Sequence, residues 1–283
     1  MSQRPYVSTA VHVSIALLTS LPALIHRLLL WNCPSECGYY CQHIVTEHRL
    51  ARDPPYLEPV VQFNGKWPFH RFLGIQEPFS VLFSFFNYAG NAWGLAQARK
   101  KVPATYPLRK YTMMFGYVGL VSWAASMVFH TRDYPITEKI DYFAAGANVL
   151  YGLYYAPIRL FRLDNPQGDK PYKNSLLRLW TLTCILLYTA HVSFLSFVRW
   201  DYTYNMAANI AVGIASNILW VGYSYGRWRN SGKTWHLWPA MIVLVVVLAM
   251  SMEVLDFVPW KLMIDAHSLW HLGTAGPTVW WCW

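Results

Sequence analysis

Long apolar segments alternate with short polar and basic loops along most of this chain of 283 residues. Each apolar segment is close to the ~20 residues with which a helix crosses the hydrocarbon core of a bilayer. Seven of them follow one another: Phe79–Ala98, Tyr111–Phe129, Tyr142–Phe161, Leu176–Val198, Tyr202–Tyr225, Leu237–Leu255 and Leu262–Trp281. The pattern predicts an all-α membrane protein with a seven-transmembrane helix bundle over residues 77–283.

Two further regions precede the predicted bundle. Residues 1–30 are mostly apolar, and we expect them to be a signal sequence or a signal anchor. Residues 31–76 are polar and contain turn-forming residues such as Asn64 and Gly65, which predict a short lumenal segment. Disulfides can form in an oxidising lumen, and this segment carries three cysteines: Cys33, Cys37 and Cys41.

The basic residues predict how the bundle is oriented. The loops and segment ends that join segments one to two, three to four and five to six hold thirteen Lys and Arg, whereas the other three connections hold four. Loops rich in Lys and Arg remain in the cytosol. We therefore expect the region before the first segment, and the connections after the second, fourth and sixth, to face the lumen.

Composition supports a membrane protein and argues against one alternative. Hydrophobic residues make up 55% of the chain and charged residues only 13%, against about 25% charged residues in an average soluble domain. The aromatic share of 17% is typical of rings at membrane interfaces. The net charge of +9 would suit nucleic acid, but the basic residues lie in short loops between apolar segments, so no nucleic-acid partner is expected.

Several ionisable residues fall at the lumenal edge of the predicted bundle. Ser126 and His130 are four positions apart near the end of the second segment, so they share one helix face. Asp141 stands at the start of the third segment, and His267 and His271 share a face at the start of the last. Ionisable groups in a membrane are costly and usually line a functional cavity.

These residue types suggest a metal-dependent hydrolase. Three imidazoles with one open coordination position are a ligand set of catalytic zinc, so His130, His267 and His271 are the expected ligands of one Zn²⁺. Asp141 is the expected general base, or orients the bound water. Ser126 would hydrogen-bond that water or stabilise an oxyanion. The implied reaction is attack of a metal-bound water on an ester or amide of a membrane lipid.

Each residue also has a simpler interpretation. A His-x-x-x-His pair on a helix is usually two packed or interfacial histidines, and a serine such as Ser126 commonly packs between transmembrane helices. Other acids near the same edge are interpreted as interfacial residues: Asp201, Glu253 and Asp256. Four groups of metal-site type on three helices at one depth nevertheless favour catalysis.

Several motifs, in order along the chain, resemble one known family. They are VQFNGKWPF at 61–69, QEP at 76–78, FHTRD at 129–133, TEKIDY at 137–142, DYTYNM at 201–206 and DAHSLWH at 265–271. From about Trp31 to the C-terminus the chain closely resembles the Per-type family, whose animal members are called post-GPI attachment to proteins factor three. The resemblance implies the seven-helix fold of alkaline ceramidases and of adiponectin and progestin receptors, in which a Ser, an Asp and three His surround a zinc. By motif these fall on Ser126, His130, Asp141, His267 and His271.

The resemblance also implies an activity. This is remodelling of GPI anchors, by removal of the sn-2 acyl chain from the phosphatidylinositol of GPI-anchored proteins, which would be the substrates and partners. The site would face the lumen of the endoplasmic reticulum or, alternatively, of the Golgi. Two other functions stay open: a ceramidase-like lipid amidase, and a non-catalytic zinc-containing receptor or scaffold. Asn64 departs from the histidine that is common in the family, but the five site positions do not.

Overall fold

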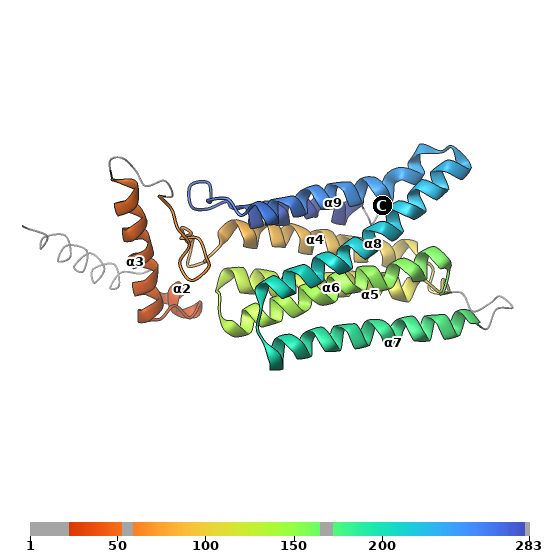
Figure 1. Ribbon diagram of the computed structural model, residues 1–283, viewed down its shortest axis with the longest axis horizontal. Coiled ribbons are helices and arrows are strands. Elements are labelled where there is room, and N and C mark those ends of the chain that lie inside the picture. The colour runs from red at the N-terminus through yellow and green to blue at the C-terminus, as the bar shows by residue number, and fades with distance from the viewer. Residues whose placement is uncertain (1–22, 53–58, 165–171, 281–283) are drawn as a thin grey trace, which may run out of the picture.

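The regular structure of the protein is helical apart from isolated β-bridges in the computed structural model, which describes residues 23–52, 59–164 and 172–280 (Figure 1). The predicted all-α class is confirmed. The elements are α2 (Ala23–Leu28), α3 (Cys33–Leu50), α4 (Pro78–Lys101), α5 (Arg109–Thr131), α6 (Pro135–Phe161), α7 (Tyr172–Ser193), η1 (Phe194–Val198), α8 (Tyr202–Ser231), η2 (Thr234–Leu237), α9 (Trp238–Leu255) and α10 (Ala266–Trp280).

Six of the long helices close into a ring. Helix α4 packs against α5 and α10, α5 packs against α6, α6 against α8, and α9 against both α8 and α10. Helix α7 packs on α6 and runs along the outside of the bundle (Figure 1). The first and last helices of the bundle are thus neighbours, because α10 lies beside α4. This closure brings residues of the second and last predicted segments to the same place.

Among the described residues, four helical segments are long and apolar enough to cross a membrane: Arg109–Thr131, Asn174–Val198, Tyr202–Ser231 and Thr234–Leu255. The protein is therefore a multi-pass membrane protein. Helices α4, α6 and α10 stand where the other three spans are predicted. Helix α10 has 15 residues, about 22 Å at 1.5 Å per residue, which is short of the ~30 Å hydrocarbon core.

Two helices begin several residues from the starts of the predicted apolar segments, for local reasons. The third segment begins at Pro135 rather than Tyr142, because proline suits the first helical turn and the Thr137 hydroxyl accepts a hydrogen bond from the Tyr134 backbone N–H at 2.9 Å. The last segment begins at Ala266 rather than Leu262, because the preceding residues form a turn in which Leu262 has φ 54°.

The segment before the bundle is partly helical and lies beyond one end of it (Figure 1). Helix α3 starts at an Asn32 cap, whose side chain accepts a hydrogen bond from the Ser35 backbone N–H at 3.0 Å. The cysteines of α3 are exposed and free: Cys33, Cys37 and Cys41. The predicted signal sequence or anchor lies largely outside the described residues. Between α3 and α4, Asn64 (φ 51°) and Gly65 (φ 79°) form the predicted tight turn.

Candidate metal centre

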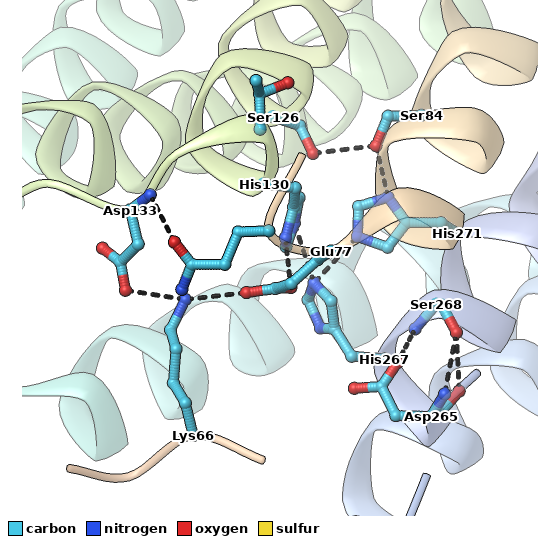
Figure 2. A network of polar contacts seen from close by, with 12 residues as sticks. Lys66, Glu77, Ser84, Ser126, His130, Asp133, Asp265, His267, Ser268 and His271 are labelled. Atoms are coloured by element: carbon cyan, nitrogen blue, oxygen red, sulfur yellow. Dashed lines mark hydrogen bonds and ion pairs between the residues drawn. The ribbon is translucent and has the colours of Figure 1, made fainter. Parts of the chain in front are cut away.

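Three histidines meet at the end of the bundle nearest to α3. His130 lies in the last turn of α5, and His267 and His271 lie in the first two turns of α10. The Nε2 atom of His267 is 3.2 Å from Nε2 of His130 and 2.8 Å from Nε2 of His271. The residues His130 and His271 are only 2% and 4% exposed. Figure 2 shows the three rings facing one another, as the spacing predicted.

Each ring is held through its other nitrogen. The Nδ1–H of His130 donates to Glu77 Oε2 at 2.6 Å, and the Nδ1–H of His267 donates to Glu253 Oε2, also at 2.6 Å. The third ring, His271, has Ser84 Oγ 2.8 Å from its Nδ1. A carboxylate only accepts hydrogen bonds, so the proton of the first two rings stays on Nδ1. Their Nε2 lone pairs then point toward a common point.

This donor set fits a metal ion. Lone pairs of neutral imidazoles that face one another at 2.8–3.2 Å repel, unless a cation or a proton lies between them. Nitrogen ligands suit Zn²⁺ and some other divalent transition metals. Metal-binding histidines almost always donate their second N–H to a carboxylate, carbonyl or water. The buried cluster of His130, His267 and His271 can therefore bind a metal ion.

Glu77 is part of a charged chain that reaches the loop before α4. Lys66 Nζ lies 2.9 Å from Glu77 Oε1 and 2.8 Å from Asp133 Oδ2 (Figure 2). Burial by itself would raise the pKa of Glu77, but the Lys66 ammonium and the His130 imidazole hold that pKa below its usual range. Burial would likewise lower the pKa of Lys66, and the two carboxylates raise it above its usual range. Glu77 is thus an ionised acceptor for His130.

Glu253 joins three helices at the site. It lies on α9, accepts a hydrogen bond from His267 on α10, and accepts another from the Tyr202 hydroxyl on α8 at 2.9 Å. The interpretation of Glu253 as merely interfacial is wrong. An acid inside an apolar segment was itself a signal of function, because such a group is costly without a partner.

Ser126 reaches the site through a second serine. Its Oγ lies 3.0 Å from Ser84 Oγ, which in turn contacts His271 (Figure 2). Asn87, one turn further along α4, donates from Nδ2 to the His271 carbonyl at 2.7 Å. Sequence reasoning missed this polar face of α4, although Ser80, Ser84 and Asn87 recur at helical spacing and are all buried.

Asp141 and Asp265 are related to the histidines in different ways. Asp141 lies in the second turn of α6 and interacts electrostatically with both His130 and His267. Asp265 precedes α10, where its carboxylate accepts from the Ser268 N–H at 2.8 Å and its own N–H donates to Ser268 Oγ at 3.0 Å. This reciprocal cap starts α10 and so sets the direction in which its histidines project.

A ring of helices, several of them long and apolar enough to cross a membrane, with a three-histidine site at one end, defines an integral membrane protein with a candidate metal centre. The chain belongs to the Per1-like family, whose model matches residues 23–283, and the predicted family is thereby confirmed. A protein of Schizosaccharomyces pombe named Protein PER1 homolog is 45% identical over 259 residues, which cover 91% of this chain and 75% of that protein.

Animal proteins named GPI-specific phospholipase A2-like PGAP3 are similar as well. The protein of Cricetulus griseus is 37% identical over 256 residues, or 90% of this chain and 75% of its own length. The protein of Homo sapiens is 36% identical over 245 residues, or 86% of this chain and 72% of its own length. No solved structure matches the chain.

Proposed function

We propose that the protein is a GPI-specific phospholipase, which hydrolyses the sn-2 ester of the phosphatidylinositol in GPI-anchored proteins. The observation that carries the proposal is the convergence of three Nε2 atoms at a buried site. The names of the relatives, which specify GPI, support the substrate class. GPI-anchored proteins are then its partners, and the membrane is the source of its substrate.

All seven long helices of the bundle cross the membrane in this proposal. Helices α4, α6 and α10 close the ring with the four apolar spans. Each also exposes large apolar side chains on its outer surface, and these chains suit contact with lipid: Leu82, Phe85, Phe86, Ile140, Phe161 and Leu272. The polar residues of α4 and α10 are buried inside the bundle, among them Ser84, Asn87 and His271. The lysine and arginine distribution supports a lumenal site, in the endoplasmic reticulum or alternatively the Golgi.

His130, His267 and His271 would hold one zinc ion, which when bound supplies a Lewis acid for the ester carbonyl and lowers the pKa of the attacking water. Glu77, Glu253 and Ser84 fix the orientation of the three rings, and they are positioning residues. Two carboxylates at Nδ1 also make the rings better electron donors.

Asp141 is the general base of the proposed reaction. Its carboxylate takes the proton from the attacking water as the oxygen of that water bonds to the acyl carbon. The bond from the acyl carbon to the sn-2 glycerol oxygen then breaks, and Asp141 returns the proton to that oxygen. The products are a free fatty acid and a lyso form of the anchor. The buried hydroxyl of Ser126 stabilises the oxyanion, directly or through Ser84.

The test is release of labelled fatty acid by purified protein. Three labelled substrates are supplied in mixed micelles. They are a phosphatidylinositol-type anchor with the label at sn-2, its isomer with the label at sn-1, and a ceramide with the label on the amide chain. The proposal expects label to be released from the sn-2 substrate alone. Release from ceramide alone would support an amidase, and no turnover by folded, metal-loaded protein would support a scaffold. Glu47→Gln, which removes an exposed carboxylate from α3, is the control variant and should keep full activity.

A further inference from the structure

A cavity lies at the opposite end of the bundle from the histidines. It has a volume of about 610 Å³, within the range of about 300–1,000 Å³ that is usual for ligand pockets. Its walls are the end of α4, the loop at 104–107, the start of α5 and the residue Asp164 after α6. Arg109 and His130 are 21 positions apart on α5, so roughly 30 Å separates the cavity from the metal centre.

The cavity is strongly basic at the N-terminus of α5, a position at which a helix favours acidic groups. Arg99, Arg109 and Lys110 line it. Arg109 and Lys110 occupy the first turn of α5, which holds no acidic residue. The N-terminus of a helix carries a partial positive charge and favours anions, so cations there repel it. An anion in the cavity would attract both the cations and the helix N-terminus, and it could accept hydrogen bonds from the helix N–H groups.

Two polar groups at the cavity lack a hydrogen bond in the part of the chain that the structure describes. The Nε of Arg109 is buried without a hydrogen bond. The side chain of Asp164 is 0% exposed, and neither of its oxygens accepts a hydrogen bond; its ion pair is with Arg162 Nε at 3.4 Å. Buried polar groups are normally hydrogen-bonded, so both point to a missing ligand. That ligand must offer an acceptor to Arg109 and a donor to Asp164.

We propose that this cavity binds the headgroup of a phospholipid that combines a phosphodiester with a hydroxyl or ammonium donor. The phosphate contacts Arg99, Arg109 and Lys110, and the donor contacts Asp164. Basic pockets between membrane helices on the cytosolic side are suited to lipid headgroups, and the lysine and arginine count predicts that this end is cytosolic. The outer side of α5 next to the cavity exposes Met114 and Tyr117, which suit the acyl chains. Phosphatidylinositol and phosphatidylethanolamine meet these requirements, whereas phosphatidylcholine has no such donor.

Native mass spectrometry of the full chain in detergent tests the proposal. With an equimolar mixture of phosphatidylinositol, phosphatidylethanolamine and phosphatidylcholine, the wild type should retain one of the first two lipids and little of the third. Arg109→Gln should lower this binding about tenfold, as expected for loss of a hydrogen bond between charged groups. Asp164→Asn should keep binding and lose the discrimination against phosphatidylcholine. Arg227→Gln removes an exposed arginine at the end of α8 and should change nothing.

Competitors separate a lipid from a small soluble anion. Inorganic phosphate or glycerophosphoethanolamine, at millimolar concentration, should leave the bound lipid in place, because neither carries acyl chains. Displacement by inorganic phosphate alone would contradict the lipid proposal. Equal lipid binding by wild type and Arg109→Gln would overturn the site. An unfolding temperature in detergent close to that of the wild type verifies that a variant is folded, and Lys110→Gln, at an exposed position, gives the same readout if Arg109→Gln does not fold.

Discussion

Glu77 Oε2 accepts a hydrogen bond from His130 Nδ1 at 2.6 Å, across 53 positions of sequence. The same Glu77 carboxylate binds Lys66, so a loop before the bundle reaches a histidine at the end of α5. We expect Glu77→Ala to lower metal affinity about 10- to 100-fold, the usual effect of removing such a partner. Chelator competition measures this affinity. Glu77→Gln, whose amide oxygen still accepts, should recover part of it.

Glu47→Gln is the matched control for Glu77, because it removes an exposed carboxylate on α3. Unchanged metal affinity in Glu77→Ala would contradict a positioning role. A fall in kcat with KM and affinity unchanged would instead make Glu77 a participant in the chemistry.

Replacing Ser84 and replacing Ser126 should affect different properties of the site, metal affinity for the first and kcat for the second. Ser84→Ala removes the group that contacts His271 Nδ1, and we expect metal affinity to fall about tenfold. Ser126→Ala leaves that contact in place, and should lower kcat about 100-fold, the scale of an oxyanion donor, while metal is retained. Metal titration and fatty-acid release on the same samples compare the variants. If Ser126→Ala lost metal as Ser84→Ala does, Ser126 would serve the ring and not the substrate.

Asp141→Asn should keep the metal and lose the reaction. The amide has the shape of the carboxylate but cannot take a proton, and general base catalysis contributes about 10²- to 10⁴-fold. Elemental analysis and fatty-acid release measure the two properties. Full activity in Asp141→Asn would remove this residue from the mechanism, and loss of metal would make it a ligand.

A buried ion pair should stabilise the segment before the bundle. Arg71 binds the Glu36 carboxylate with Nη1 at 2.8 Å and Nη2 at 2.5 Å, and its guanidinium stacks on Trp31 and Tyr39. Arg71→Leu leaves the buried Glu36 without its arginine partner and with only His26 Nδ1 at 3.4 Å, and breaking such a buried pair costs about 3–5 kcal/mol. The expected result is a lower Tm in detergent, with part of the loss recovered when Glu36→Gln is added. A double variant as unstable as the sum of the single variants would indicate no coupling.

Helical spacing and the predicted topology were enough to predict that the three histidines lie close together. Helical spacing depends only on neighbouring residues, and the topology follows from counting basic residues along the chain. His267 and His271 share a helix face, and the count of basic residues predicts which ends of the segments lie together. The Asn64-Gly65 turn was also predictable, since these residues favour positive φ.

The partners of the histidines were not predictable in the same way. Glu77 and Ser84 meet their rings only through tertiary packing, across 53 and 187 positions. Helices begin away from the starts of the predicted apolar segments where a cap outweighed hydropathy, as at Pro135 and Ala266. Among the described residues, length and composition identify four spans while the pattern predicts seven, and α10, with 15 residues, is shorter than a spanning helix.

The most direct test of the account is the metal content of detergent-purified protein, measured by elemental analysis together with sn-2 fatty-acid release. The wild type should contain about one zinc per chain, and the double variant His267→Ala, His271→Ala should contain none and release no fatty acid. A folded wild type that hydrolyses the anchor at full rate after its metal has been removed by a chelator would contradict the account.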